Sequence, residues 1–221
     1  MILSNISSRN FGSKDDSMSV HIDSSAKLSN KVYFSGKAFI GPNCILGYFG
    51  FQHSSWDADE FARLEEIKKT EIGDNARVLG NSEICSGSKI GRDFRCDYNC
   101  LVGENSKLGN NVVVEYGARI YDNCNVKDNC TIGGFICNGS TVGAGSVVQG
   151  ALVHARTLPG LEDAPTIGEN CLVGTNSTLV GAITMANSSV LAAGSVLLES
   201  TEEGYLYAGN PARRIKIATW Y

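Results

Sequence analysis

The chain has 221 residues, with 43% hydrophobic residues, 19% charged residues, 25 glycines and a formal net charge of −4. This charge, with no run of Lys or Arg, argues against nucleic acid or an anionic membrane as a partner. No apolar stretch reaches the roughly 18 residues of a membrane-spanning helix, and residues 1–19 lack an apolar signal core, so we expect neither membrane insertion nor secretion. The many glycines and few charges favour a turn-rich β protein over a helical one.

A six-residue repeat runs through most of the chain. Large aliphatic residues begin its units in three stretches, 22–46, 72–148 and 167–197, and one four-residue step from Ile132 to Ile136 shifts the phase. A period of six fits neither a helix nor a plain hairpin. It predicts short straight segments joined by tight corners, with the large residue of each unit inside.

Two other places of the unit have a preferred residue type. The second place is often glycine, as at Gly73 and Gly91, which indicates unusual dihedral angles or close backbone approach. The fifth place is small. Five cysteines occupy it: Cys44, Cys100, Cys124, Cys130 and Cys171. Cys96 takes a large interior place, and no CxxC pair occurs. We therefore interpret the cysteines as core thiols in a reducing, cytoplasmic protein.

This pattern resembles the hexapeptide-repeat family over about residues 22–200. The resemblance implies an all-β fold, a single-stranded left-handed parallel β-helix with three hexads per coil, and a homotrimer. An N-terminal segment, 1–21, would precede the β-helix, loops 47–71 and 155–165 would interrupt it, and a tail, 201–221, would follow it. The first loop is expected to hold a short helix from Asp57 and an exposed His53.

The segment from Ala208 to Arg213, Ala-Gly-Asn-Pro-Ala-Arg, resembles the tail of hexapeptide acetyltransferases of the galactoside, maltose and xenobiotic type. That resemblance implies acetyl-CoA as co-substrate and a reaction that requires no metal. The basic residues of the tail suit the phosphates of CoA; the alternative is a solvated basic tail. The implied CoA-binding residues are Gly174, Thr175, Ala192, Ala193, Gly209, Arg213, Arg214 and Lys216.

In the same acetyltransferases a histidine ends one coil, a loop follows, and the helix resumes about a dozen residues later. His154 and the loop 155–165 reproduce this order, so the resemblance implies that His154 is the catalytic base. Imidazole titrates near neutrality and can take the proton of a hydroxyl or amine that attacks a thioester. Six residues after Val148, His154 is expected to replace an interior aliphatic residue. The alternative is a coil-end histidine that only bonds to backbone. Glu162, Asp163 or Glu115 could orient its ring.

The N-terminal half resembles the nucleotide-sugar N-acetyltransferases, except that Tyr98 stands where those enzymes usually have histidine. We expect Tyr98, Asn99 and Glu115 to line the site of a sugar whose amino or hydroxyl group accepts the acetyl group directly. Such a sugar would be used in surface polysaccharide synthesis.

Two alternatives stay open. One is a protein resembling γ-type carbonic anhydrase, which needs three histidines around zinc. His154 would match the first, but the other two positions fall on Thr175 and Val180, and His21 and His53 would have to converge on the site. The other alternative is a non-catalytic β-helical scaffold.

Overall fold

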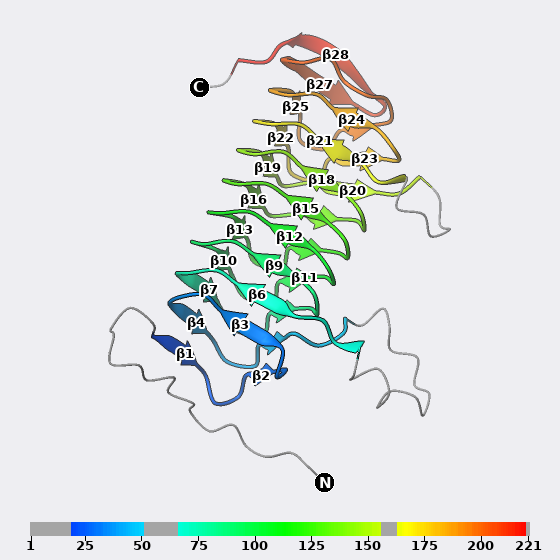
Figure 1. Cartoon of the computed structure of the whole chain (residues 1–221). Coiled ribbons are helices and arrows are strands. Elements are labelled where there is room, and N and C mark those ends of the chain that lie inside the picture. Colours follow the sequence, from blue (N-terminus) through cyan, green and yellow to red (C-terminus); the bar gives the residue numbers. More distant parts are fainter. Residues whose placement is uncertain (1–18, 51–65, 156–162, 220–221) are drawn as a thin grey trace.

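The computed structural model describes residues 19–50, 66–155 and 163–219, and shows a parallel β-helix (Figure 1). Each coil except the last contributes one strand to each of three sheets, and the strands of each sheet stack along the helix axis. Sheet B has nine strands, one for each coil. Within the described residues no helix could cross a membrane. The predicted helix from Asp57, and His53, lie outside the described residues.

The strands are given by sheet. Sheet A, in spatial order, contains β1 (Val20–Ile22), β4 (Ala38–Ile40), β7 (Ala76–Val78), β10 (Arg95–Cys96), β13 (Val113–Val114), β16 (Thr131–Ile132), β19 (Val147–Val148), β22 (Leu172–Val173), β25 (Val190–Leu191), β27 (Tyr205–Gly209) and β28 (Ala212–Ile217). Sheet B contains β2 (Lys27–Leu28), β5 (Ile45–Leu46), β8 (Glu83–Ile84), β11 (Leu101–Val102), β14 (Arg119–Ile120), β17 (Phe135–Ile136), β20 (Ala151–Val153), β23 (Thr178–Val180) and β26 (Val196–Leu197). Sheet C contains β3 (Val32–Phe34), β6 (Thr70–Ile72), β9 (Lys89–Ile90), β12 (Lys107–Leu108), β15 (Asn125–Val126), β18 (Thr141–Val142), β21 (Thr166–Ile167) and β24 (Thr184–Met185).

The predicted interior column is present along most of the helix. The register places each large residue beside its equivalent in the next coil, as for Cys96 and Val114, and both are fully buried. The prediction of a parallel β-helix is therefore confirmed. Ile22, expected inside, is 39% exposed. It lies in the first described coil, where no described coil covers it from below.

The corners depend on a place in the unit that the sequence analysis did not single out. Among the described residues, twelve non-glycine residues have positive φ, and ten of them are asparagines in the fourth place. Asparagine tolerates the left-handed conformation better than other residues with a side chain. Stacked corner residues also bond to one another, as when Asn75 Nδ2 donates to Asp93 Oδ1 at 2.8 Å.

The second-place glycines allow neighbouring coils to approach closely. A Cβ atom at Gly91 would overlap the carbonyl group of Gly109 in the next coil. Of the two reasons expected for glycine in this place, close backbone approach is therefore the one that applies at Gly91.

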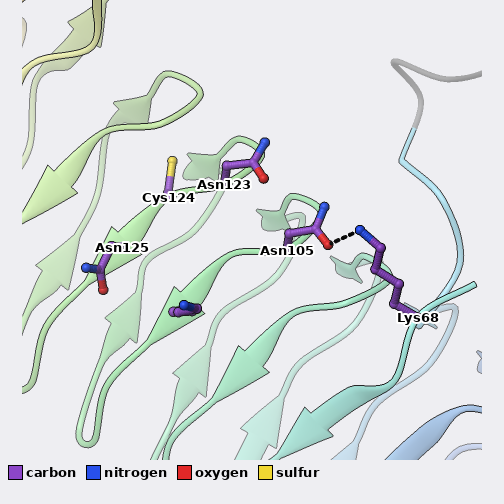
Figure 2. A pocket seen from close by; sticks show the side chains of 6 residues that line it. Lys68, Asn105, Asn123, Cys124 and Asn125 are labelled. Atoms are coloured by element: carbon purple, nitrogen blue, oxygen red, sulfur yellow. Dashed lines mark hydrogen bonds between the residues drawn. The ribbon is translucent and has the colours of Figure 1, made fainter. Parts of the chain in front are cut away.

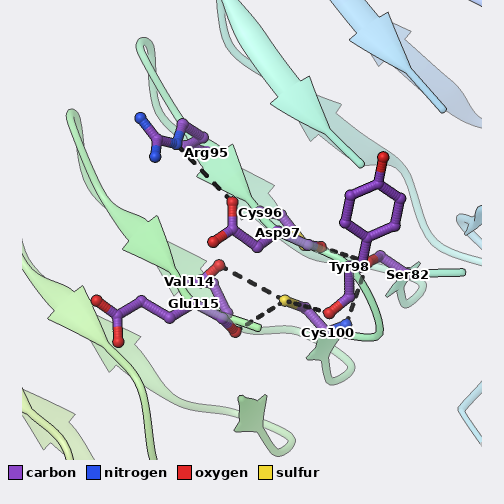
Figure 3. A network of polar contacts seen from close by, with 8 residues as sticks. All are labelled: Ser82, Arg95, Cys96, Asp97, Tyr98, Cys100, Val114 and Glu115. Atoms are coloured by element: carbon purple, nitrogen blue, oxygen red, sulfur yellow. Dashed lines mark hydrogen bonds and ion pairs between the residues drawn. The ribbon is translucent and has the colours of Figure 1, made fainter. Parts of the chain in front are cut away.

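Small residues in the fifth place bond to backbone in the next coil. The hydroxyl group of Ser82 donates to the carbonyl of Asp97 at 2.8 Å, and Cys100 Sγ lies 3.1 Å from the carbonyl oxygen of Glu115 (Figure 3). All eight cysteines are free and buried, which confirms their interpretation as core residues. Burial raises the pKa of the Cys124 thiol to about 12.

The C-terminal tail forms a hairpin that the sequence did not predict. Strand β27 continues sheet A by pairing in parallel with β25, and β28 returns antiparallel to β27. Tyr207 is 8% exposed, and its hydroxyl oxygen accepts a hydrogen bond from the backbone N–H of Glu202 at 2.8 Å. The hairpin therefore covers the last coil at one end of the helix (Figure 1).

Candidate functional site

The functional residues predicted from the sequence lie on two corners of the helix. The A–B corner is the set of turns that lead from sheet A strands to sheet B strands, and the B–C corner leads from sheet B to sheet C. Both loops, 47–69 and 154–165, leave the helix at the B–C corner, because they follow β5 and β20 of sheet B.

His154 follows β20 directly and lies on the B–C corner. It does not take the interior place, and that prediction was wrong. Leu152 is the interior residue: it is fully buried and pairs with Ile136 below and Leu179 above. The phase error arose because a second four-residue step, from Val148 to Leu152, follows the one that ends at Ile136.

The imidazole of His154 lies half-buried at the base of the second loop. In the two coils below, the equivalent residues are Asp122 and Asn138, and they accept hydrogen bonds from backbone. Asp122 Oδ1 accepts from the N–H of Glu104 at 2.7 Å, and Asn138 Oδ1 accepts from the N–H of Asp122 at 3.3 Å. Within the described residues, the side chain of His154 has no such bond.

Two of the three carboxylates that could orient the His154 ring, Glu115 and Asp163, lie among the described residues. Glu115 lies on the A–B corner, separated from His154 by the width of sheet B, and bonds to Gln149. It is therefore not placed to orient His154 within one chain. Asp163 is half-buried at the other end of the second loop. Glu162 lies outside the described residues.

The predicted CoA-binding residues come together at the C-terminal end of the A–B corner. The N–H of Gly174 donates to the carbonyl of Leu191, and the N–H of Gly194 donates to the carbonyl of Thr175 at 3.0 Å. The N–H of Gly209 donates to the hydroxyl of Ser195 at 3.0 Å, which fixes the hairpin turn beside this corner. The residues brought together in this continuous surface are Gly174, Thr175, Ala192, Ala193 and Gly209.

The three predicted phosphate-binding cations differ in their surroundings. Arg214 Nη1 bonds to Glu202 Oε2 at 2.6 Å, and the guanidinium lies 4.7 Å from the centre of the Tyr205 ring. Arg213 is exposed, and its Nη1 donates only to the carbonyl of Ala212 at 3.2 Å among the described residues. Lys216 is also exposed. Arg213 and Lys216 are therefore freer than Arg214 to bind an anion.

The predicted substrate residues also lie on the A–B corner, five to six coils before the hairpin. Figure 3 shows two of them, Tyr98 and Glu115. Tyr98 is 46% exposed, and its ring packs towards Gly80 of the preceding coil. Asn99 has φ of 61° and forms the corner, as asparagine does elsewhere in the helix. Glu115 is half-buried, and its Oε2 accepts a hydrogen bond from Gln149 Nε2 at 2.9 Å.

Sequence reasoning missed Gln149 because it lies in the segment whose phase was misread. The signal was available: Gly150 follows Gln149 just as Gly134 follows Gly133 in the coil below, and each pair replaces a longer corner. The Glu115–Gln149 bond joins two coils across the coil that contains Gly133.

A shallow depression of about 450 Å³ lies beside the base of the first loop (Figure 2). Lys68 Nζ donates to Asn105 Oδ1 at 3.0 Å across it. Its lining residues are Lys68, Asn105, Lys107, Asn123, Cys124 and Asn125. None of these residues was a predicted site residue. The sequence offered no sign of a depression here beyond asparagines in the fourth place of the unit.

The arrangement of the histidines does not suit a three-histidine metal site. His21 lies in β1 and stacks on Phe39, with ring centres 5.1 Å apart. From that coil to the coil of His154 there are six steps, or about 29 Å at roughly 4.8 Å per step. His21 and His154 therefore cannot share a metal ion within one chain. Among the described residues no group of metal-binding side chains converges.

Comparisons with known proteins agree with the repeat. The family model for the hexapeptide repeat of succinyl-transferase matches residues 166–199. A serine acetyltransferase of Bacillus licheniformis is 29% identical over 175 residues, which cover 76% of this chain and 65% of that protein. The bifunctional protein GlmU of Pseudoalteromonas atlantica is 26% identical over 207 residues, which cover 91% of this chain and 39% of that protein. The chain thus spans less than two thirds of the length of either relative.

A solved structure, the UDP-N-acetylglucosamine acyltransferase of Francisella novicida, overlaps 90% of this chain and 68% of its own. The sequence identity is 14% and the TM-score is 0.45. An overlap at this level gives no information on the substrate.

Proposed function

We propose that this chain, whose residues 166–199 match the hexapeptide-repeat model and whose relatives include named acetyltransferases, transfers an acetyl group from acetyl-CoA to a sugar. The observation that carries the proposal is the continuous surface of small residues on the A–B corner. Glycine and alanine there leave backbone groups accessible to a long, narrow ligand. The hairpin adds two exposed cations, Arg213 and Lys216, that suit the phosphates of CoA.

His154 is the proposed general base. Its ring removes the proton from the acceptor hydroxyl or amine as that group attacks the thioester carbonyl, and the CoA thiol leaves. Backbone N–H groups of a neighbouring coil would stabilise the tetrahedral intermediate. Transfer is direct in this proposal. All eight cysteines are buried, away from a bound thioester, and burial also raises the pKa of thiols such as Cys124 and Cys171.

The two corners are separated by sheet B, and the outer surface of this sheet suits the extended arm of acetyl-CoA. The outward residues of β20, β23 and β26 are Ala151, Thr178 and Val196, all small and half-buried. The sheet is about three residues wide here, or about 10 Å at roughly 3.3 Å per residue. The arm of acetyl-CoA can therefore run from the A–B corner across these residues towards His154.

The proposed active assembly is a homotrimer with clefts between subunits. The outward residues of sheet A are mostly apolar in the C-terminal half, whereas those of sheet C are polar. On sheet A they are Val113, Thr131, Val147, Leu172, Val190 and Leu206. On sheet C they are Lys89, Lys107, Asn125, Thr141, Thr166 and Thr184. A flat apolar surface of this kind suits burial against another copy of the chain. A cytoplasmic location is part of the same proposal.

The test combines ligand binding with turnover. A ligand that binds only the native state raises the melting temperature, so acetyl-CoA should raise it and zinc should not. Turnover is followed by mass spectrometry of the acetylated product, with nucleotide amino sugars, methyl glycosides and serine as acceptors. His154→Ala should lower kcat by about 100-fold or more while the protein stays folded.

The matched control is His21→Ala, which removes an exposed histidine six coils away from His154 and should leave turnover unchanged. Equal turnover in wild type and His154→Ala would refute the proposed base. No stabilisation by acetyl-CoA would refute the transferase. Acetylation of serine alone would keep the transferase and refute the sugar acceptor.

A further inference from the structure

Two consecutive coils are shortened at the A–B corner. Thr131 pairs with Val147 sixteen residues later, whereas Val113 and Thr131 are eighteen residues apart. The interior residues still stack without interruption, so the missing residues come from the corner alone. The corner therefore lies closer to the helix axis in these two coils than in the coils below and above.

We call this set-back surface the recess; it is formed by the corners 133–134 and 149–150. Its floor is backbone, because Gly134 and Gly150 lie in direct contact and a Cβ at Gly134 would overlap the carbonyl oxygen of Gly150. Three coil steps separate the corner of Tyr116 from that of Thr175, or about 14 Å at roughly 4.8 Å per step. The recess lies within this interval along the helix axis.

A polar pair crosses the recess. Glu115 from the coil below and Gln149 from the coil above meet over Gly133, with 2.9 Å between Gln149 Nε2 and Glu115 Oε2. Gly133 makes this contact possible, because a Cβ there would overlap both Gln149 Oε1 and Glu115 Oε2. The pair leaves three groups for a ligand: Glu115 Oε1 and Gln149 Oε1 as acceptors, and the second N–H of Gln149 as a donor.

An exposed aromatic residue adjoins this polar pair in the chain: Tyr116, which directly follows Glu115, is 70% exposed. Phe135, which directly follows Gly134, is 38% exposed, but its ring packs against Tyr121 on the B–C corner, with ring centres 4.8 Å apart. Two acceptors, one donor and the ring of Tyr116 match the neighbouring hydroxyl groups and the apolar face of a pyranose.

We propose that the recess is the sugar subsite of the protein, in which Glu115 and Gln149 bind two neighbouring hydroxyl groups and Tyr116 covers the ring. This inference rests on the proposed acetyl transfer to a sugar. It also explains the position of the predicted residues, because the recess lies between Glu115 and the CoA surface at Gly174 and Thr175. The subsite excludes acyclic acceptors such as serine, which lack a ring to contact Tyr116.

Gln149→Leu and Tyr116→Ala test the subsite in the full chain. Gln149→Leu keeps a similar volume and removes the amide, and Tyr116→Ala removes the ring. Each should raise the KM for the sugar about 10-fold, the effect of about 1.4 kcal/mol. The KM for acetyl-CoA should stay within about twofold of wild type. Tyr33→Ala is the control, since Tyr33 is 51% exposed on sheet C near the opposite end of the helix.

Binding is also measured without turnover, by saturation-transfer NMR with methyl β-D-glucopyranoside and methyl β-D-galactopyranoside. A signal in wild type that is lost in Gln149→Leu and kept in Tyr33→Ala supports the subsite, even if acetyl-CoA does not bind and the transferase proposal fails. A signal that survives in both Gln149→Leu and Tyr116→Ala, or no signal from either glycoside, overturns the subsite. That second result leaves acetyl transfer to be judged by the acetyl-CoA melting shift.

Discussion

Replacing Leu152 with alanine tests which residue fills the interior where the second loop begins. Leu152 is fully buried between Ile136 and Leu179, and the coils above and below leave little room to collapse around a cavity. A buried leucine cut to alanine costs about 3 kcal/mol, within a range of about 2–5 kcal/mol. His154 is half-buried and bonds to no other described side chain or backbone group. His154→Ala should therefore change stability by less than about 1 kcal/mol.

Thermal and denaturant unfolding measure the contrast. For a chain of this size each kcal/mol shifts the melting temperature by about 2–4 °C, so Leu152→Ala should melt about 6–12 °C below wild type. Circular dichroism and tryptophan fluorescence must give coincident transitions, because repeat proteins can unfold in parts. Leu198→Ala is the control: Leu198 is 49% exposed and lies next to the interior residue Leu197. If His154→Ala lowered the melting temperature as much as Leu152→Ala, the assignment of the interior residue would be refuted.

Three further predictions follow from the coils. Gly91→Ala should lower the free energy of unfolding by more than about 2 kcal/mol, because the added Cβ overlaps the next coil. Gly117 has φ of 72° and open space around it, so Gly117→Ala should lower that free energy by only about 1–2 kcal/mol. Urea titrations measure both changes. The pKa of Cys124 is raised to about 12 in the folded protein, so its contribution to stability is complete below the unfolded thiol's pKa and is lost as pH rises towards 12. Urea titrations between pH 8 and 11 should show a smaller decline in Cys124→Ser, and an equal decline would contradict the assignment. Val147→Glu should dissociate the proposed trimer in light scattering whereas Thr141→Glu on sheet C should not, and a trimer that survives Val147→Glu would place the interface elsewhere.

The sequence predicts this fold well because one residue type repeats in one place of each unit. A large residue inside one coil must fit the large residues of the coils above and below, so the period is strict and readable. The prediction of interior residues from the six-residue period goes wrong where a corner is two residues shorter, because the interior residues stay stacked while their spacing in the sequence changes. Gly133 and Gly134 marked the first such corner, and the same mark at Gly150 was missed.

The prediction of CoA-binding residues stays a prediction. Gly174, Thr175, Ala192 and Ala193 lie together because they share places in successive coils. Gln149 could not be recognised from its type, since glutamine is common on surfaces and only its contact with Glu115 over Gly133 singles it out. The hairpin was missed because its strands pair through backbone and carry no six-residue period.

The geometry of the helix also explains why the candidate chemistry lies at corners. A residue inside a coil is held by the coils above and below it, and an outward strand residue lies beside its equivalents in a regular sheet. Turns are the only places where a coil can gain a loop, as after His154, or lose residues, as at Gly134 and Gly150, without disturbing the interior. Each such change creates a surface that differs from the repeat. The two changes lie on either side of sheet B in neighbouring coils, so a saccharide held in the recess has to extend across sheet B, about 10 Å, for its acceptor group to reach the thioester at His154.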